Sequence, residues 1–520
     1  MKKIVVEKNS YYDSVFLMLI NKQLKKVTGV NDVAISMGTQ MNVELLREVG
    51  FFNRDLEGVA PNDLIIAVDA ESEAIAENAL ASAKNMLKAK RHGTDESDDY
   101  RPASLDTAIG MVPGANLVVI SVPGAYAARE ARKALQKGLH VMLFSDNVSL
   151  EEEVELKKLS KEKGLLMMGP DCGTAIINGI PLCFANAIRR GNIGLVGASG
   201  TGLQEVSCII HNSGGGITHV IGTGGRDLRS NLVGGTTMLM GIESLKNDPD
   251  TTVIVVISKP PAEDVAEIVI AALRETRKPC VIHFVGLEPL KEEKNLHFAG
   301  NLEEAANLAV ALARREPYQA RTFTLPENDI VRIIKIETER MSPNQKFLRG
   351  LYTGGTLADE AMILFDKWIG GTHSNFQTKP DLLLKDPQIS EGHTIIDLGD
   401  ECFTVGRPHP MIDPSTRAER LLKETSDSEV AVFLLDFVLG YCSHEDPAGA
   451  ILESLKMAKK MAEDRGGFLS ILASLTGTDG DIQNVNEQKN KLESIGCVVM
   501  PSNYQASMLA IRIIQELCKL

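Results

Sequence analysis

The sequence predicts an α/β protein built from three stacked, doubly wound domains with parallel sheets. Short runs of β-branched and aliphatic residues alternate with longer helical patterns almost from end to end. Continuous apolar strands of this kind are typical of parallel sheets that are covered by helices on both faces. The strand–helix unit recurs without a fixed period, which favours stacked domains over a solenoid. With 520 residues, the chain is also too long for one hydrophobic core.

The expected strands fall into two series along the chain. In the first half they cover residues 33–37, 64–68, 117–122, 140–144 and 165–168. Further along the chain they cover residues 193–196, 252–257, 281–285, 394–398, 431–436 and 468–473. Helical patterns separate them, for example over residues 125–137 and 150–163.

Composition shifts along the chain suggest the domain boundaries. Residues 1–185 are expected to form a CoA-binding-like Rossmann domain, and residues 186–320 a flavodoxin-type domain. Residues 321–344 are polar and contain prolines, which indicates a linker, and residues 345–520 form the last domain. The charge-rich stretch 88–101 is interpreted as an insertion inside the first domain.

Charge and cysteine content narrow the possible partners and the compartment. The net charge of −14 argues against nucleic acid and against an anionic membrane surface. Eight cysteines are scattered without paired spacings, which gives no disulfide framework and indicates a reducing, cytoplasmic environment. No apolar run approaches the roughly 20 residues of a membrane span, and no signal peptide is evident.

The most informative motif is the stretch NIGLVGASGTGLQE over residues 192–205. An apolar strand breaks there into a turn and then opens a helix, so backbone N–H groups and the positive end of the helix dipole face one point. Such a point holds phosphates, carboxylates or acyl phosphates, and Ser199, Gly200 and Thr201 are its candidate binding residues. The alternative interpretation is an ordinary turn between a strand and a helix.

Two further segments of the middle domain carry similar chemistry. Gly224 and Gly225 precede Arg226 in the stretch IGTGGRD, which indicates a backbone anion site with a cation beside it. Arg226 could instead pair with the neighbouring Asp227. Lys259 follows an apolar strand, where the side chains of an open α/β sheet line the ligand crevice. A solvated lysine at the start of a helix is the alternative.

The last domain contains a third glycine turn and two unusual loops. Thr353, Gly354 and Gly355 form the turn in LYTGGT, and Gly440 lies in the loop LDFVLGYCSHED. The stiff segment GRPHPMIDP holds Arg407, His409 and Asp413, which are the candidate catalytic residues because a rigid loop fixes their side chains. The spacings typical of metal ligands are absent from the sequence, so no protein-bound metal is expected.

These motifs, in this order, resemble those of succinyl-CoA synthetases. MGPDCG, VGASGTGLQE, VIGTGGRD and VVISKPPAE are similar to segments of the α subunit, and residues 345–520 are similar to the carboxy-terminal domain of the β subunit. GPDCGT, VGASGTG, SKPPAE, LYTGGTLA and GRPHPMIDP resemble the FdrA family of acyl-CoA synthetase-like proteins nearly word for word, over essentially the whole chain.

Departures from the ligase pattern weigh against a CoA ligase. Residues 11–51 offer no equivalent of the CoA loop, and the ATP-grasp half of the β subunit has no counterpart. The phosphorylated histidine of the ligases lies in a Gly-His-Ala-Gly loop, whereas this chain reads EKNLHFAGN. His297 is the candidate at that place, but it lacks the frame of small residues.

The resemblance implies a function in purine breakdown. FdrA-type proteins are implied to be one subunit of a three-component oxamate carbamoyltransferase of allantoin breakdown, in which oxalurate and phosphate exchange with oxamate and carbamoyl phosphate. The sequence then predicts a helix N-terminus near Ser199 that faces another near Gly440, with phosphate or carbamoyl phosphate as a small anionic substrate. The alternatives are an ATP- and CoA-dependent acyl-CoA ligase and a non-catalytic scaffold subunit. An oligomer with other subunits is expected in each case.

Overall fold

The fold was analysed in a computed structural model that separates the chain into two compact units. Unit 1 comprises Met1–Arg101 with Val405–Pro408, and unit 2 comprises Pro102–Thr404 with His409–Leu520. The residues that the structure describes are 1–8, 10, 12, 17, 20–21, 23–25, 27–39, 42–43, 46–47, 51, 56–91, 102, 104–404 and 407–518. Each unit is described by itself below.

Unit 1 contains an antiparallel sheet with the strand order β1-β3-β2. The strands are β1 (Lys2–Glu7), β2 (Val30–Met37) and β3 (Leu64–Ala70), and helix α3 (Glu73–Arg91) follows β3. Helix α3 packs its alanines against the face of β3 that carries Leu64, Ile66 and Val68. Ile65 and Ala67 are buried on the opposite face of β3.

This architecture differs from the doubly wound domain that was expected over residues 1–185. The described strands of the first 101 residues are antiparallel, and the parallel sheet begins only in unit 2. The physical reason lies in β3, which is the central strand and is buried on both faces. A central antiparallel strand of this kind has the same continuous apolar sequence as a parallel strand. Most of the charged stretch 88–101 lies outside the described residues.

Unit 2 begins with a small parallel sheet of the order β4-β5-β6. Its strands are β4 (Leu117–Ile120), β5 (His140–Leu143) and β6 (Met167–Met168). The accompanying helices are α4 (Leu105–Met111), α5 (Gly124–Gln136) and α6 (Leu150–Lys163). Alanines of α5 and Leu156 of α6 pack on the sheet. A capping box between Ser149 and Glu152 begins α6.

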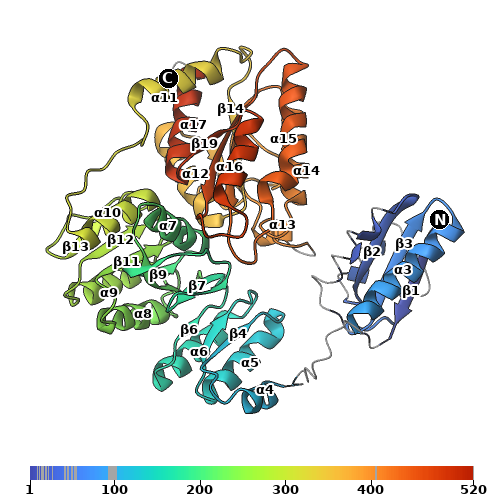
Figure 1. The fold of residues 1–520 in the computed structure, drawn as a ribbon, viewed down its shortest axis with the longest axis horizontal. Helices are drawn as coiled ribbons and strands as arrows, with labels where there is room; N and C mark the ends of the chain where they lie inside the picture. Colours follow the sequence, from blue (N-terminus) through green and yellow to red (C-terminus); the bar gives the residue numbers. More distant parts are fainter. Residues whose placement is uncertain are drawn as a thin grey trace. The chain divides into compact units, whose positions relative to one another are not determined.

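A seven-stranded sheet of the order β13-β12-β11-β9-β10-β7-β8 forms the centre of unit 2. Strands β9 to β13 are parallel, whereas β7 and β8 form an antiparallel hairpin at one edge. The strands are β7 (Thr174–Ile177), β8 (Ile180–Cys183), β9 (Arg190–Ala198), β10 (Ile217–Gly222), β11 (Val253–Ser258), β12 (Cys280–Phe284) and β13 (Leu296–Phe298). Helices α7 (Gly200–Asn212) and α10 (Leu302–Arg314) cover one face, and α8 (Thr236–Asn247) and α9 (Glu263–Arg274) cover the other (Figure 1).

The last part of unit 2 is a six-stranded parallel sheet of the order β15-β16-β14-β17-β18-β19. Its strands are β14 (Phe347–Tyr352), β15 (Thr372–His373), β16 (His393–Asp397), β17 (Val430–Val438), β18 (Ser470–Thr476) and β19 (Val498–Met500). Helices α12 (Gly355–Trp368) and α17 (Asn503–Cys518) lie on one face. Helices α14 (Ser415–Thr425), α15 (Pro447–Glu463) and α16 (Val485–Ser494) lie on the other, and the short helix α13 (Glu401–Thr404) follows β16.

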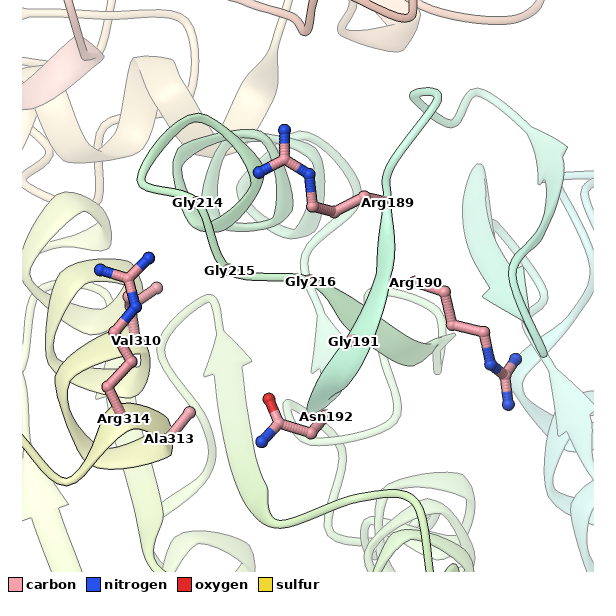
Figure 2. A pocket seen from close by; sticks show the side chains of 10 residues that line it. All are labelled: Arg189, Arg190, Gly191, Asn192, Gly214, Gly215, Gly216, Val310, Ala313 and Arg314. Carbon is pink, nitrogen blue, oxygen red and sulfur yellow. The ribbon is translucent and has the colours of Figure 1, made fainter.

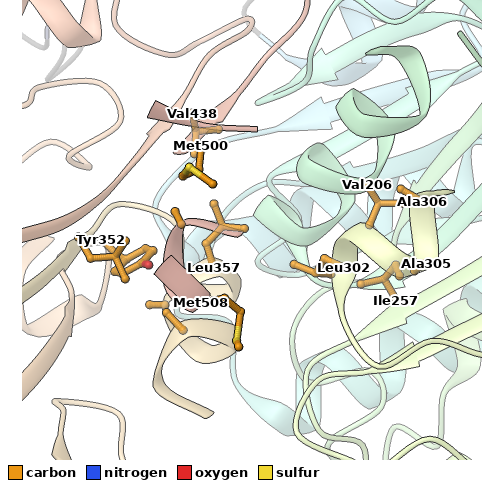
Figure 3. Packing of buried hydrophobic residues seen from close by; sticks show 14 of the residues in the cluster. Val206, Ile257, Leu302, Ala305, Ala306, Tyr352, Leu357, Val438, Met500 and Met508 are labelled. Atoms are coloured by element: carbon orange, nitrogen blue, oxygen red, sulfur yellow. The ribbon is translucent and has the colours of Figure 1, made fainter. Parts of the chain in front are cut away.

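The two larger sheets of unit 2 share one hydrophobic core. Val206, Ile257 and Leu302 from the seven-stranded part belong to the same buried cluster as Leu357 and Met508 from the six-stranded part (Figure 3). The segment expected as a linker contains helix α11 (Glu327–Thr338), whose buried Ile330 and Ile334 join this core. The parallel α/β fold predicted from the sequence is thus confirmed in unit 2, and its two larger parts are docked as one body.

Buried carboxylates line this shared interface. Glu205 of α7 accepts hydrogen bonds from the Asn503 backbone nitrogen (2.9 Å) and from Thr476 Oγ1 (2.5 Å). Glu360 of α12 accepts from the Leu302 backbone nitrogen (2.9 Å) and from Asn503 Nδ2 (2.8 Å). Burial raises the pKa of Glu205 to about 7 and that of Glu360 to about 7. The packing of the two sheets is therefore coupled to the protonation of these side chains.

Candidate functional site

The first turns of helices α7 and α12 meet at the interface between the two larger sheets. Ser199, the N-cap of α7, donates a hydrogen bond from its hydroxyl to Thr356 Oγ1 (2.9 Å). The Thr356 backbone nitrogen donates to Thr201 Oγ1 (3.3 Å). A Cβ atom on Gly354 would lie 2.9 Å from Thr201 Cγ2, so glycine allows the two turns to touch. Two helix N-termini, each with N–H groups that lack an intrahelical acceptor, therefore meet at one place.

The helix that faces α7 is not the one expected near Gly440, and that expectation is wrong. Gly440 has a φ of +107° and lies in a loop, and α15 begins only at Pro447, after its N-cap Asp446. The Gly440 nitrogen donates to Gln483 Oε1 (3.1 Å). A Cβ atom on Gly440 would lie 2.5 Å from the Ala185 carbonyl oxygen. This glycine therefore serves a close approach of two chain segments, and α12 takes the place predicted for the later helix.

Lys259 and Asp397 lie at the first turn of α12, where the carboxyl ends of β11 and β16 come together. A Cβ atom on Gly355 would lie 2.6 Å from Asp397 Oδ2 and 3.3 Å from Lys259 Nζ. Lys259 Nζ forms an ion pair with Asp359 Oδ2 of α12 at 2.8 Å. Lys259 keeps 27% of its side-chain surface exposed. A cation, two carboxylates and a helix N-terminus thus lie close together.

The same contacts set the protonation of this cluster. Burial raises the pKa of Asp397 to about 7, although the ammonium group of Lys259 opposes the shift. Burial lowers the pKa of Lys259, but the carboxylates of Asp359 and Asp397 outweigh it and the pKa is raised overall. Lys259 therefore stays a cation at neutral pH, while Asp397 exchanges a proton there. A carboxyl group with such a pKa is suited to general acid–base catalysis.

His409 lies beside this cluster. A Cβ atom on Gly399 would lie 2.5 Å from His409 Nε2 and 3.1 Å from Asp397 Oδ1. The backbone nitrogen of Met411 donates to His409 Nδ1 (3.2 Å), so Nδ1 is an acceptor and the neutral ring carries its proton on Nε2. Burial lowers the pKa of His409 to about 4, which keeps the ring neutral at pH 7. His409 can thus donate one hydrogen bond toward the cluster.

Asp171, in the GPDC loop after β6, is a second carboxyl group of unusual pKa near Lys259. Burial, and then the negative charge of Asp146, raise the pKa of Asp171 to about 6, and the charge of Lys259 opposes them. The motif around Asp171 carries part of the family resemblance, but Asp171 is not among the candidate residues predicted from the sequence.

The turn formed by Thr353 and Gly354 already binds a carboxylate of the protein, that of Asp436. The backbone nitrogens of Thr353 and Gly354 donate to Asp436 Oδ1 (2.8 Å) and Oδ2 (2.7 Å), respectively. Asp436 is fully buried and pairs with the buried Arg417 at 3.2 Å. These two N–H groups are therefore occupied, and only the part of the turn at Gly355 opens toward Lys259 and Asp397.

The glycine turn before Arg226 is packed against other parts of the chain. A Cβ atom on Gly224 would lie 2.2 Å from the Pro170 carbonyl oxygen, and one on Gly225 would lie 3.4 Å from Asp171 Oδ2. Arg226 forms an ion pair with the buried Glu153 of α6 at 2.8 Å and donates to the Val148 carbonyl oxygen at 2.6 Å. This turn thus fastens the small parallel sheet to the seven-stranded one, and a role in phosphate binding stays a prediction.

Among the described residues, the contacts of Asp413 and His297 lie outside this cluster. Arg407 is exposed and belongs to the short segment Val405–Pro408, which is grouped with unit 1. Asp413 Oδ1 accepts from the Ser415 nitrogen (3.1 Å) at the start of α14. His297 lies in the edge strand β13, where its nearest acidic partner is Glu292 at 3.5 Å. Gly406 lies outside the described residues.

Comparison with known proteins places this architecture in a family. Residues 188–286 match the family described as CoA binding domain, and residues 351–513 match the family described as CoA-ligase. The chain is 47% identical over 512 residues to the uncharacterized protein YahF of Escherichia coli (strain K12), with 98% of each chain covered. The chain belongs to the YahF family.

More distant relatives of this YahF family member are subunits of CoA ligases. It is 27% identical over 177 residues to the succinate–CoA ligase [ADP-forming] subunit alpha 2 of Archaeoglobus fulgidus, covering 33% of this chain and 60% of that subunit. It is 26% identical over 196 residues to the ADP-forming sulfoacetate-CoA ligase subunit SauD of Bilophila wadsworthia, covering 36% and 64%. The chain therefore matches less than two thirds of each subunit. The CoA-binding match lies in the seven-stranded part and not in residues 1–185, where such a domain was expected.

Residues 1–102 match the family described as AllF, heavy metal-associated domain. This segment contains no cysteine, and its single histidine is His92. Thiolates and imidazoles are the ligands that soft and borderline metals prefer. Within the described part of the chain, no three side chains of His, Cys, Asp or Glu come together as a metal site. The residues present therefore do not fit a thiolate metal centre. Among the described helices, none is long and apolar enough to cross a membrane.

Proposed function

We propose that this protein is the FdrA-type subunit of an oxamate carbamoyltransferase, exchanging oxalurate and phosphate with oxamate and carbamoyl phosphate. The observation that supports the proposal is the convergence of Lys259 and Asp397 on Gly355, the first residue of α12. Carbamoyl transfer to phosphate needs a place for an oxyanion and a group that moves one proton. The cluster offers both.

Phosphate is held in this proposal at Gly355, in the first turn of α12, together with Lys259. The N–H groups of Thr353 and Gly354 already donate to Asp436, and that of Thr356 donates to Thr201. The N–H groups of a first turn lack intrahelical acceptors and lie at the positive end of the helix dipole. The ammonium group of Lys259 adds a full positive charge within 3.3 Å of the Cβ position of Gly355. Groups fixed in this way stabilise negative charge that develops during the reaction without reorganisation. Ser199 and Thr201 fix the position of α12 through their bonds to Thr356.

Asp397 moves the proton. An oxygen of hydrogen phosphate attacks the carbamoyl carbon of oxalurate, which forms the new C–O bond. The bond from that carbon to the amide nitrogen breaks, and its electron pair goes to the nitrogen. The ionised Asp397 accepts the proton of hydrogen phosphate and passes it to this nitrogen, so that oxamate leaves as a neutral amide and no net proton is consumed. A pKa of about 7 suits a group that both accepts and donates the proton at neutral pH.

The test is formation of oxalurate from oxamate and carbamoyl phosphate, catalysed by the full chain alone and together with the subunits that copurify with it. Asp397→Asn removes the proton carrier with little change in volume, and kcat is expected to fall by about 10²–10⁴-fold. Lys259→Met is expected to lower kcat by about 10²–10³-fold. Lys367→Met is the matched control, because Lys367 is an exposed lysine that forms a surface ion pair with Glu288. Oxalurate formation that is unchanged in Asp397→Asn would contradict the proposal.

Acyl-CoA ligase activity is the second candidate, and the family matches over residues 188–286 and 351–513 favour it. That reaction would pass through a phosphorylated histidine, for which His297 is the candidate. Residues 11–51, where a CoA loop was sought, are described only in part. Incubation with ATP and CoA, followed by phosphopeptide mapping, separates the two functions: phosphate on His297 supports the ligase, and an unlabelled chain that forms oxalurate supports the transferase.

A third interpretation makes the chain a scaffold whose turns bind an effector while a partner subunit performs the chemistry. In that case Asp397→Asn would leave the activity of the assembled complex unchanged. The proposal also includes a cytoplasmic location. It further includes an oligomer with other subunits, which a size measurement of the copurified complex tests directly.

A further inference from the structure

A cavity of about 240 Å³ lies at the amino ends of β9 and β10, away from the candidate site. Residues 214–216, all glycines, form one wall, and Asn192 and Ala313 contribute to the others. Arg189 and Arg314 lie on either side of the glycine wall (Figure 2). The cavity is therefore a concave site with three arginines, including Arg190, and a short apolar surface.

This cavity is separate from the cluster at Lys259. Helix α7 begins with Gly200 at the candidate site and ends with Asn212, next to the glycines of the cavity. Its 13 residues span about 20 Å. An anion bound in the cavity would thus not be part of the chemistry proposed above, and this inference does not depend on that proposal.

The guanidinium groups of Arg189 and Arg314 are only partly used by the protein. One nitrogen of Arg314 donates to the Ser213 carbonyl oxygen (2.7 Å). Arg189 Nη2 lies 3.2 Å from His211 Nε2. His211 Nδ1 accepts a hydrogen bond from the Arg189 backbone nitrogen (3.0 Å), so a neutral His211 carries its proton on Nε2. This N–H donates a hydrogen bond to Asp479. The ring therefore offers no acceptor to the Arg189 guanidinium.

Arg190, by contrast with Arg189 and Arg314, has an acidic partner for its guanidinium group. It donates to Asn178 Oδ1 and forms an ion pair with Asp250 at 3.0 Å. Its side chain points away from the glycine wall, whereas those of Arg189 and Arg314 lie along it (Figure 2). Neither Arg189 nor Arg314 forms an ion pair with a carboxylate of the described residues. The hydrogen bond from His211, and then the charge of Arg189, lower the pKa of Asp479, so this carboxylate acts on Arg189 from beyond the histidine without a direct ion pair.

We propose that this cavity binds a small organic dianion, a phosphomonoester or a short dicarboxylate, between Arg189 and Arg314. Guanidinium groups bind such oxyanions through paired N–H donors. The glycine wall gives the ligand access to the backbone, and Val310 and Ala313 contact its carbon atoms. A ligand of this kind acts as an effector, because the cavity lies at the opposite end of α7 from the reacting groups.

The test is calorimetric titration of the full chain with glycerol phosphate, malonate and acetate. The measurement is repeated in Lys259→Met, so that binding at the candidate site is subtracted. Asn192→Asp places a negative charge in the cavity with almost no change in volume, and it is expected to weaken dianion binding by about tenfold or more. Arg189→Gln and Arg314→Gln are expected to act similarly. Arg190→Gln is the matched control, with an equal change of charge and an expected effect below about twofold.

Each outcome decides the inference. Dianion binding that persists in Lys259→Met and is lost in Asn192→Asp supports it, and the preference between glycerol phosphate and malonate identifies the ligand class. An unfolding temperature of Asn192→Asp that matches the wild type shows that the fold is intact. The inference is overturned if no dianion binds at about 10 mM, if acetate binds as well as the dianions, or if Arg190→Gln weakens binding as much as Arg314→Gln.

Discussion

Two glycine turns that look alike in the sequence have different surroundings in the structure. The turn at Gly224 and Gly225 lies directly against Pro170 and Asp171 of the same unit. The turn that ends at Gly355 has its first two N–H groups occupied by Asp436 and opens at its end toward a lysine and a titrating carboxyl group. The comparison shows that a glycine-rich turn marks a close approach to its backbone. At Gly224 the approaching group is the backbone of Pro170, and at Gly355 it is the side chains of Asp397 and Lys259, where we propose the site.

The largest expected effect is on the free energy of unfolding, and it comes from the Asp436 carboxylate that binds the turn at Thr353 and Gly354. Asp436→Asn removes the charge that faces the buried Arg417 and the turn at Thr353. Because the guanidinium is then left buried without its partner, the free energy of unfolding is expected to fall by about 3–5 kcal/mol. Urea denaturation measures the change.

Asp427→Asn is the control for that prediction. Asp427 also pairs with an arginine, Arg349, but it is 38% exposed, so its loss should cost about 1 kcal/mol or less. Equal losses in the two variants would show that Asp436 does not hold the turn.

The second prediction tests whether the turn opens onto a site. A methyl group on Gly355 would lie 2.6 Å from Asp397 Oδ2 and would displace the carboxyl group from Lys259. Gly355→Ala is therefore expected to lower kcat for oxalurate formation by about 10²-fold. Gly371→Ala provides a comparison, since nothing lies within 4 Å of its Cβ position, although its φ of +65° makes it a test of stability as well. Full activity in Gly355→Ala would mean that the reacting groups lie elsewhere.

The third prediction concerns the interface between the two larger sheets, where the carboxyl group of Glu205 is buried. The folded-state pKa of Glu205 is raised to about 7, so the folded protein binds this proton more tightly than the unfolded chain does. Its contribution is fully present below the unfolded pKa, near 4.5, and is lost as the pH rises through about 7. The free energy of unfolding should thus fall between pH 5 and pH 8, by on the order of 1–3 kcal/mol for this group.

Glu205→Gln tests that dependence, because the amide cannot ionise yet keeps an oxygen for the Asn503 nitrogen. Its unfolding free energy should vary less with pH than that of the wild type. Glu263→Gln, on the surface of α9, should leave the wild-type dependence in place. A parallel pH profile in Glu205→Gln and wild type would refute the role of Glu205.

The last prediction concerns the first turn, at Gly224 and Gly225, and includes the smallest expected effect, that of Gly225→Ala. Gly224 has a φ of +86° and would bring a Cβ atom within 2.2 Å of the Pro170 carbonyl oxygen, so Gly224→Ala should destabilise the fold by about 1–3 kcal/mol. Gly225→Ala meets only ordinary contact at 3.4 Å and is expected to change stability by about 0.5 kcal/mol or less. Thermal unfolding distinguishes them. Equal and small effects of the two variants would mean that the Pro170 carbonyl oxygen does not pack tightly against Gly224.

Much of the fold could be predicted from the sequence, because continuous apolar strands such as those at residues 252–257 and 431–436 are buried in the two larger sheets as β11 and β17. The arrangement of unit 1 could not, since β3 is apolar on both faces in an antiparallel sheet. Helix α11 was missed because its surroundings in the sequence are polar and contain prolines.

The site was predicted only in part. Lys259 and Gly355 were named because each follows a strand, and the structure brings them together. Asp397 was missed, although the end of its strand was a visible signal. Its chemistry arises from burial beside Lys259, which lies 138 positions earlier in the chain. No local pattern contains that contact. Gly224 and Gly355 cannot be told apart by sequence, because the group that approaches each backbone comes from a different part of the fold.

The most direct test of the account is the binding of carbamoyl phosphate to the full chain by calorimetry, in the wild type, Lys259→Met and Lys367→Met. The account predicts that the wild type and Lys367→Met bind with the same affinity and that Lys259→Met binds about tenfold or more weakly. The titration is made in Asn192→Asp as well, so that heat from the arginine cavity does not contribute. Binding that is indifferent to Lys259, or that requires CoA, would contradict the claim that the first turn of α12 holds the transferred group.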